Sequence, residues 1–146
     1  MTTTHDPWLR QRSASDWIAE ARSSLARAKH AMEDRDQRSL IALLKHGAGV
    51  ALNAVLLVQS HPTWGRLPTQ HLAGLAITEG APPDVRKAAQ LLHDARVTDS
   101  SLVQLGRSPS SPQALFDFAS LIVGYSERIA LSNGSSTRSS IPPNPP

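Results

Sequence analysis

The stretch that decides the fold is residues 39–59, SLIALLKHGAGVALNAVLLVQ. It reads as one helix that is apolar almost all the way round, interrupted only by Lys45, His46 and Asn53. A helix without a polar face must be enclosed by other helices or by a membrane. Because glycines and polar residues break the stretch too often for a membrane span, we expect the central helix of a bundle and no membrane partner.

The composition of the chain limits its class and location. Its 146 residues suit one domain with a single sizeable core. It contains no cysteine, so it can form neither a disulfide nor a thiolate metal site, which fits a reducing compartment. The first residues, MTTTHDPWLRQR, are polar and include no apolar signal core. We therefore expect a cytoplasmic protein.

The charge pattern does not favour nucleic-acid binding. The formal net charge is only +3, and the isoelectric point near 10.0 reflects an excess of arginine over few acidic residues. The chain has no run of five or more basic residues, and aromatic residues make up 4% of it. Few stacking platforms exist for single strands. RNA therefore remains an alternative partner, but the composition does not favour it.

Helices are also predicted on the N-terminal side of the central stretch. Ser13 or Ser15 can cap a first amphipathic helix that ends near Glu33. Asp36 is the expected cap of the central helix. That helix should end near residue 60, because the residue before Pro62 avoids the helical region.

The second half of the chain predicts shorter helices and turns. We expect a short helix over about 71–78, a long helix from about 83 to 95, and a final helix from about 112 to 131. Residues 98–112 should be mostly turn, with one helical turn at 101–105. No strand pattern is apparent.

These elements predict an all-α fold. Four long helices with short links form an antiparallel four-helix up-and-down bundle, here with one short extra helix. The bundle should span residues 13–131, after a flexible N-terminal arm at 1–12. The Ser/Pro-rich tail at 132–146 has too few large apolar residues to offset its ordering entropy, so we predict that it is disordered.

The order of elements resembles the HEPN domain, the higher eukaryote and prokaryote nucleotide-binding family. The patterns that carry the resemblance are Ala21-Leu25-Ala28, then His46, Ala48, Ala51, Leu52, Ala54 and Leu56, then His71-Leu72, and finally the helices from Val85 and Leu115 onward. The resemblance implies a HEPN-like bundle and frequent homodimers. It also implies a nucleotide-type ligand or a protein partner, often a nucleotidyltransferase, in toxin–antitoxin or stress systems.

Two departures from the family pattern point away from catalysis. Many members carry Glu and Lys in the second helix, where this chain has Gly49-Val50 and Asn53. Ribonuclease members carry Arg, four to six residues and then His at the start of a late helix. The last helix here, PQALFDFASLIVGYSERIAL, contains no His. We therefore expect a non-catalytic binding member rather than an enzyme.

Arg66 and His71, in GRLPTQHL, nevertheless have the Arg-x4-His spacing. As a displaced metal-independent ribonuclease pair, His71 would act as general acid/base and Arg66 would stabilise phosphate charge. In the simpler interpretation, Arg66 is solvated or binds a carbonyl, and His71 caps a short helix. Pro68 lies between them and prevents one helix from presenting both. The ribonuclease is therefore the alternative function.

Trp64 is the third feature of this loop. Beside Gly65, it is expected to pack the loop onto the bundle. The alternative is an exposed anchor for a partner protein.

His46 and Asn53 lie seven residues apart on one side of the central helix, in a row that includes Ala42 and Gly49. One interpretation is a polar pocket between helices that binds a ligand. A second is that small residues admit a close neighbouring helix and each polar group finds a local partner. The HEPN resemblance adds a third, a face against a second subunit.

No motif indicates a metal or cofactor. The six histidines are scattered, and no two lie three to five residues apart beside a carboxylate. The phosphate-binding loop and nucleophile-elbow motifs are absent from the sequence. Three hypotheses remain: a non-catalytic binding module, a ribonuclease using Arg66 and His71, and a purely structural helical module.

Overall fold

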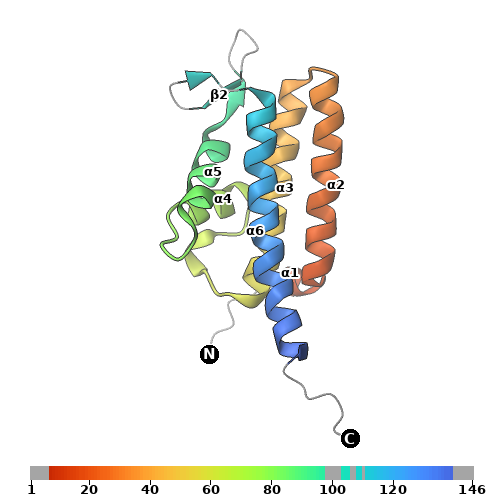
Figure 1. Cartoon of the computed structure of the whole chain (residues 1–146), viewed down its shortest axis with the longest axis vertical. Coiled ribbons are helices and arrows are strands. Elements are labelled where there is room, and N and C mark those ends of the chain that lie inside the picture. Colours follow the sequence, from red (N-terminus) through yellow and green to blue (C-terminus); the bar gives the residue numbers. More distant parts are fainter. Residues whose placement is uncertain (1–6, 98–102, 106–107, 110, 140–146) are drawn as a thin grey trace, which may run out of the picture.

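The computed structural model describes residues 7–97, 103–105, 108–109 and 111–139 (Figure 1). Its helices and strands are, in chain order, α1 (Pro7–Arg10), α2 (Ala14–Glu33), α3 (Gln37–Val58), the 3-10 helix η1 (Pro62–Trp64), α4 (Pro68–Ala76), α5 (Pro83–Asp94), β1 (Arg96–Val97), β2 (Val103–Leu105), β3 (Ser108–Pro109) and α6 (Pro112–Ser139). The fold is all-α apart from the three short strands.

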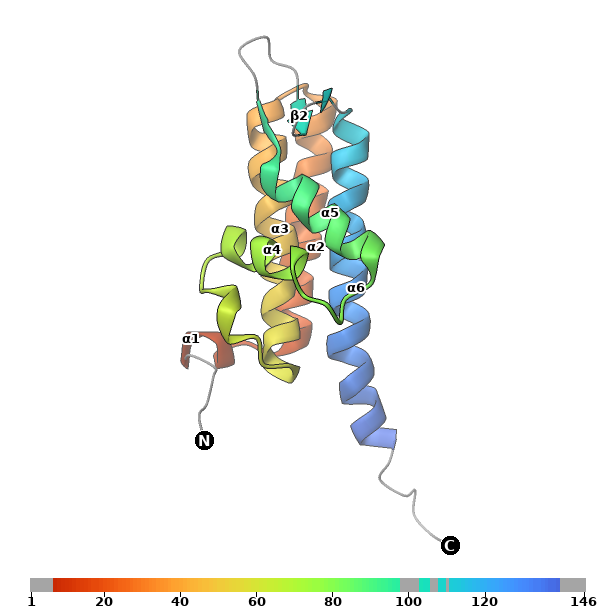
Figure 2. The ribbon, with the colours of Figure 1, turned by 90° about the vertical axis from the view of Figure 1, so that its left-hand side faces the viewer.

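Three long helices form the body of the molecule. α2 runs opposite to α3 and α6, and α3 packs against both (Figure 1). The shorter α4 and α5 lie across the remaining side of α3 and α6 (Figure 2). The arrangement therefore differs from four long helices side by side. α5 has only 12 residues, so α4 and α5 together occupy the place expected for one long helix.

The two predicted helix starts in the first half are confirmed. Ser13 caps α2, its hydroxyl accepting from the backbone N–H of Asp16 at 3.0 Å, while the Asp16 carboxylate accepts from the Ser13 N–H. Asp36 caps α3 by accepting from the Ser39 N–H at 3.2 Å. α3 ends at Val58, before the predicted proline stop. Local capping chemistry therefore fixes both boundaries.

The predicted start of α4 is wrong. The helix begins at Pro68 rather than near residue 71, because proline suits the first turn of a helix. The Gln70 carboxamide oxygen accepts from the backbone N–H groups of Arg66 and Leu67 at 2.9 and 3.0 Å. These bonds satisfy two donors that precede the helix, and they place His71 inside α4.

Two predictions for the last third also need correction. Val103–Leu105 is a strand rather than a helical turn, and it pairs antiparallel with both β1 and β3. α6 continues to Ser139 rather than ending near residue 131, so the predicted disordered tail is helical over 132–139. Extending an existing helix needs no new nucleus, which offsets the poor helix propensity of this segment. Residues 140–146 and 1–6 lie outside the described chain.

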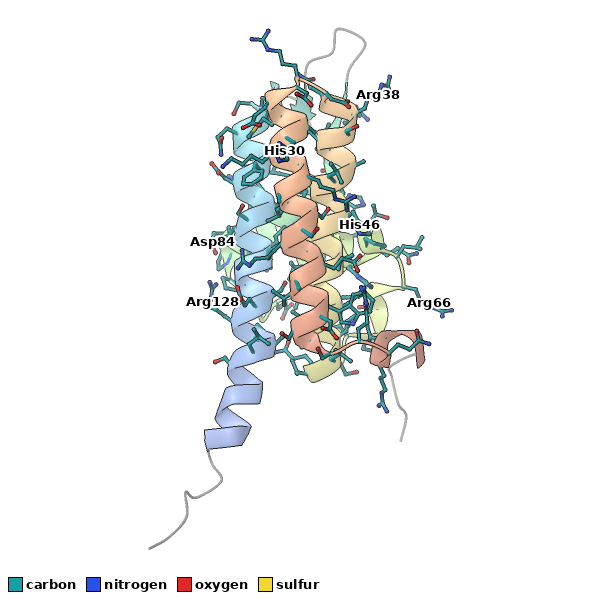
Figure 3. The ribbon with its side chains drawn as sticks, turned by 90° about the vertical axis from the view of Figure 1, so that its right-hand side faces the viewer. His30, Arg38, His46, Arg66, Asp84 and Arg128 are labelled. Atoms are coloured by element: carbon teal, nitrogen blue, oxygen red, sulfur yellow. The ribbon has the colours of Figure 1, made fainter. Side chains whose placement is uncertain are left out.

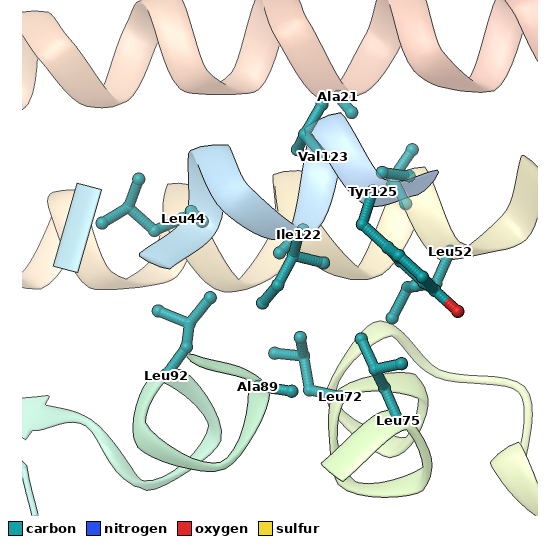
Figure 4. Packing of buried hydrophobic residues seen from close by; sticks show 14 of the residues in the cluster. Ala21, Leu44, Leu52, Leu72, Leu75, Ala89, Leu92, Ile122, Val123 and Tyr125 are labelled. Atoms are coloured by element: carbon teal, nitrogen blue, oxygen red, sulfur yellow. The ribbon is translucent and has the colours of Figure 1, made fainter. Parts of the chain in front are cut away.

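α3 supplies the centre of the core, as its sequence predicts. Leu44, Ala48, Leu52 and Val55 are fully buried against residues of α2, α4, α5 and α6 (Figure 4). By length and composition, α3 is a candidate membrane span, but 67% of that window is buried inside the molecule. Enclosure by neighbouring helices accounts for its apolar sequence.

Candidate functional site

Trp64 anchors the loop between α3 and α4. It is 1% exposed, and its indole Nε1 donates to the Thr78 hydroxyl at 3.1 Å. Its ring stacks on His61 with centroids 4.1 Å apart and an interplanar angle of 7°. Gly74 lies so close that a Cβ there would be 2.3 Å from the indole. Trp64 therefore packs the loop onto the helices, and the alternative of an exposed partner anchor is wrong.

His71 is enclosed rather than poised for catalysis. It is 1% exposed, and its Nδ1 lies 3.2 Å from the Gly49 carbonyl oxygen on α3. A carbonyl can only accept, so Nδ1 carries the proton and Nε2 is left as an acceptor. Nε2 is buried without a hydrogen-bond partner among the described residues. Burial lowers the pKa of His71, which keeps the ring neutral. The expected capping role is therefore also wrong.

The structure does not bring Arg66 and His71 together as an acid/base pair. Arg66 is exposed and points away from the helices (Figure 3). His71 belongs to the interior of α4 and contacts α3. A general acid must come within hydrogen-bond reach of the reacting oxygen, and an enclosed imidazole cannot meet that requirement without rearrangement.

His46 and Asn53 are also separated. The His46 side chain is 44% exposed (Figure 3), with Nε2 at 3.2 Å from a Glu20 carboxylate oxygen on α2. Glu20 also pairs with Arg12, whose hydrogen bond is the main cause of the lowered pKa of Glu20. Asn53 is buried, and its Oδ1 lacks a partner within the described chain. A shared ligand pocket between them does not form.

Small residues in this row do admit close neighbours. A Cβ at Gly49 would lie 2.3 Å from Cβ of Pro68 at the start of α4. The interpretation of Gly49 as a close-packing position is therefore confirmed. Ala42, at the other end of the row, is exposed.

A cleft of about 410 Å³ opens beside the Trp64 loop. It lies where the end of α3, the turn after α4 and the second half of α6 meet. Its lining residues are Gln59, His61, Thr78, Gly80, Pro82, Tyr125, Arg128 and Ile129. The volume falls in the range of about 300–1,000 Å³ that is typical of small-molecule sites.

The polar groups of this cleft suit an anionic ligand. Arg128 supplies a positive charge, and none of the described residues that line the cleft carries a carboxylate. Burial raises the pKa of Tyr125, which outweighs the opposing effect of Arg128, so the phenol stays a neutral donor. Its hydroxyl lies at the outer end of a ring that leaves the aliphatic core (Figure 4).

His61 provides a flat, neutral surface in the same cleft. Its Nε2 lies 3.0 Å from the Gln59 carboxamide oxygen, which can only accept. Nε2 therefore carries the proton and Nδ1 is an acceptor. Burial lowers the pKa of His61, which favours this neutral form. Thr78 is already engaged, since its hydroxyl donates to the Gly74 carbonyl at 2.7 Å.

The sequence alone does not identify the residues of this cleft. His61 belongs to the predicted helix stop before Pro62, and Gln59 is the last residue of the apolar stretch at 39–59. Tyr125 and Arg128 lie three residues apart in YSER, a spacing that places them on one face of α6. That spacing was the available signal.

Comparisons with protein-family models, curated proteins and solved structures find no match. The HEPN resemblance therefore rests on the sequence patterns alone. Within the described residues, no group of three or more His, Asp or Glu side chains could hold a metal ion.

Proposed function

We propose that this chain is a non-catalytic, HEPN-like binding module whose ligand is a nucleoside monophosphate. The observation that supports this proposal most is the composition of the Arg128 cleft. Its described lining residues supply a cation, a neutral phenol and a neutral imidazole, and none of them is a carboxylate. The volume of about 410 Å³ suits one nucleotide rather than a strand.

The phosphate would be held by Arg128. A guanidinium offers several donors in a fixed plane and binds phosphate oxygens in pairs. The Tyr125 hydroxyl lies in the same cleft and can donate a further hydrogen bond. Because Arg128 is exposed, a bound phosphate keeps part of its hydration. Its desolvation cost is therefore limited.

The base would lie against His61. Trp64 stacks behind this ring and holds it in place. The Gln59 amide N–H₂ can donate to a ring nitrogen or carbonyl of the base. The apolar side chains of Pro82 and Ile129 complete the lining.

The enclosed position of His71 argues for binding over cleavage. A ribonuclease would need this imidazole at the surface, and its exposure is 1%. The HEPN resemblance extends the proposal to a second copy of the chain and to a nucleotidyltransferase-type protein as partners. Light scattering after size-exclusion chromatography tests the homodimer directly.

The ligand proposal is tested by titrating the protein with AMP, GMP, CMP and UMP by calorimetry and tryptophan fluorescence. We expect saturable binding by at least one nucleotide, weakened about tenfold or more in Arg128→Gln, as for a lost charge-assisted hydrogen bond. The matching nucleoside should bind wild type and Arg128→Gln equally.

Arg27→Gln is the matched control, because it removes one exposed positive charge from α2. Its nucleotide affinity should equal that of wild type. The absence of any nucleotide binding, or equal weakening by both substitutions, would contradict the proposal.

A further inference from the structure

The carboxyl end of α5 lies beside α3 (Figure 2). A second cleft, of about 400 Å³, is found there. It is lined by Lys45, His93, Asp94, Ala95 and Arg96, and it shares no residue with the Arg128 cleft. Its distinguishing group is a primary amine, held between two elements that are far apart in the sequence.

Lys45 is held in place by a backbone carbonyl, and no carboxylate of the described residues forms an ion pair with its amine. It leaves an otherwise apolar part of α3, is half-buried, and its Nζ donates to the His93 backbone carbonyl at 3.0 Å. A neutral carbonyl can accept a hydrogen bond from an amine in either its charged or its neutral form. Burial is the main influence on the pKa of Lys45 and lowers it, against a smaller opposing effect of Asp94.

Asp94 is positioned by other groups. Its Oδ2 accepts from the Gln90 carboxamide at 2.8 Å, and its Oδ1 lies 3.1 Å from Nδ1 of His93. These contacts fix the orientation of the carboxylate, which lines the same cleft as the amine. They also lower the pKa of Asp94, with the Gln90 bond as the main cause.

Arg96 completes the cleft at its exposed side. Its guanidinium can hold a ligand carboxylate in two parallel hydrogen bonds.

We propose that Lys45 is a reactive amine that forms a reversible Schiff base with small 2-oxo acids, whose carboxylate is held by Arg96. The Lys45 nitrogen attacks the ligand carbonyl carbon, and a proton passes from nitrogen to the carbonyl oxygen to give a carbinolamine. Loss of that oxygen as water leaves a carbon–nitrogen double bond, and addition of water reverses the step. No oxidant or reductant is needed.

The competing explanation is that Lys45 only caps α5. A lysine commonly binds the last carbonyls of a helix, and the bond to His93 fits that role. A cap predicts no special reactivity. The chain contains two other lysines, Lys29 and Lys87, both exposed, which provide internal standards.

The experiment is reductive labelling of the folded chain at neutral pH with glyoxylate and cyanoborohydride, which converts the Schiff base into a stable secondary amine. Peptide mass spectrometry then follows labelling at each lysine. We expect Lys45 to label about tenfold faster than the exposed Lys29 and Lys87. Equal or slower labelling at Lys45 would overturn the proposal.

Two variants separate reactivity from carboxylate recognition. Arg96→Ala should slow labelling of Lys45 by glyoxylate but not by propionaldehyde, which has no carboxylate; equal rates with glyoxylate would remove Arg96 from the proposal. Lys45→Arg keeps a donor for the His93 carbonyl, so its melting temperature should match wild type while all labelling at position 45 is lost. Neither result depends on nucleotide binding in the other cleft.

Discussion

α3 is buried on the side that meets α2 and on the side that meets α4, but its close contacts differ between these two faces. On the α2 side, a Cβ at Gly47 would lie 3.2 Å from the Ala21 carbonyl oxygen, a contact that a small shift relieves. The buried Ser24 hydroxyl on this side donates to the Leu43 carbonyl at 2.8 Å. This face is tight, and its Ser24 hydroxyl is satisfied.

The α4 side is tighter and less satisfied. Gly49 meets the backbone and side chain of Pro68 at distances that leave no room for a Cβ. His71 bonds the Gly49 carbonyl, yet its Nε2 and the Asn53 Oδ1 have no partner among the described residues. Unsatisfied buried polar atoms cost free energy. The α4 side of α3 is therefore less stable than it could be, a pattern typical of functional regions.

The largest expected loss of stability comes from disrupting the buried centre of α3, which its two faces share. Ala51→Asp places a charge at a fully buried position of α3. An unpaired buried charge costs several kcal/mol, comparable with a total stability of about 5–15 kcal/mol. We expect loss of helical circular dichroism and of a cooperative thermal transition. Ala42→Asp, on the exposed side of the same helix, is the control and should fold normally.

A direct test of the comparison is Gly49→Ala against Gly47→Ala. Alanine gains about 1 kcal/mol in helix propensity at either position. At Gly49 that gain is outweighed by overpacking against Pro68, so we expect a net destabilisation of about 2 kcal/mol or more. At Gly47 the two effects nearly cancel, and the change should stay within about 1 kcal/mol. Urea unfolding measures both; equal losses would erase the distinction between the two faces.

The sequence predicts the fold well where one local interaction decides it. Ser13 and Asp36 identify two helix starts because a cap needs only residues a few positions away. The strand at Val103–Leu105 and the reach of α6 to Ser139 could not be predicted in this way. Strand pairing depends on partners elsewhere, and the end of a helix without a strong stop depends on small propensity differences.

The candidate site was less predictable for a geometric reason. His46 and Asn53 share a row in the sequence pattern, but His46 is exposed and Asn53 is buried. The Arg128 cleft combines residues from the end of α3, the turn after α4, and α6. No local spacing connects such segments. Trp64 was predictable because a large aromatic residue beside turn residues is usually buried against the fold.

A pH titration should show that His71 accounts for part of the free-energy cost of the polar groups buried on the α4 side. Its pKa is lowered in the folded chain, so below about pH 6.5 the unfolded state binds a proton that the folded state refuses. Stability is therefore constant above that pH and falls as the pH drops below it, by at most about 1.4 kcal/mol per pH unit for this group.

The measurement is urea unfolding between pH 7.5 and 5. His61, whose pKa is also lowered by burial, contributes in the same direction. The lowered carboxylate pKa values, such as that of Glu20, act only nearer pH 4. His71→Gln should flatten the slope, while His30→Gln, at an exposed position, should leave it unchanged. If the unfolding free energy of His71→Gln depends on pH as steeply as that of wild type, burial does not lower the pKa of His71 in the folded chain.

The smallest expected effect is deletion of Ser132–Pro146. In Figure 1, the last part of α6 continues beyond the ends of α2 and α3, so the body of the molecule does not depend on it. Its residues SNGSSTRS are poor helix formers, so its loss removes little intrinsic stability. We expect the melting temperature to fall by no more than about 4 °C, the change that corresponds to about 1 kcal/mol. A larger fall that depends on protein concentration would place this segment in a homodimer interface, because association stabilises a fold by mass action. A larger fall that does not depend on protein concentration would instead mean that the segment packs on its own chain. A third stabilising surface, at the end of α6, would then have to be added to the two faces of α3.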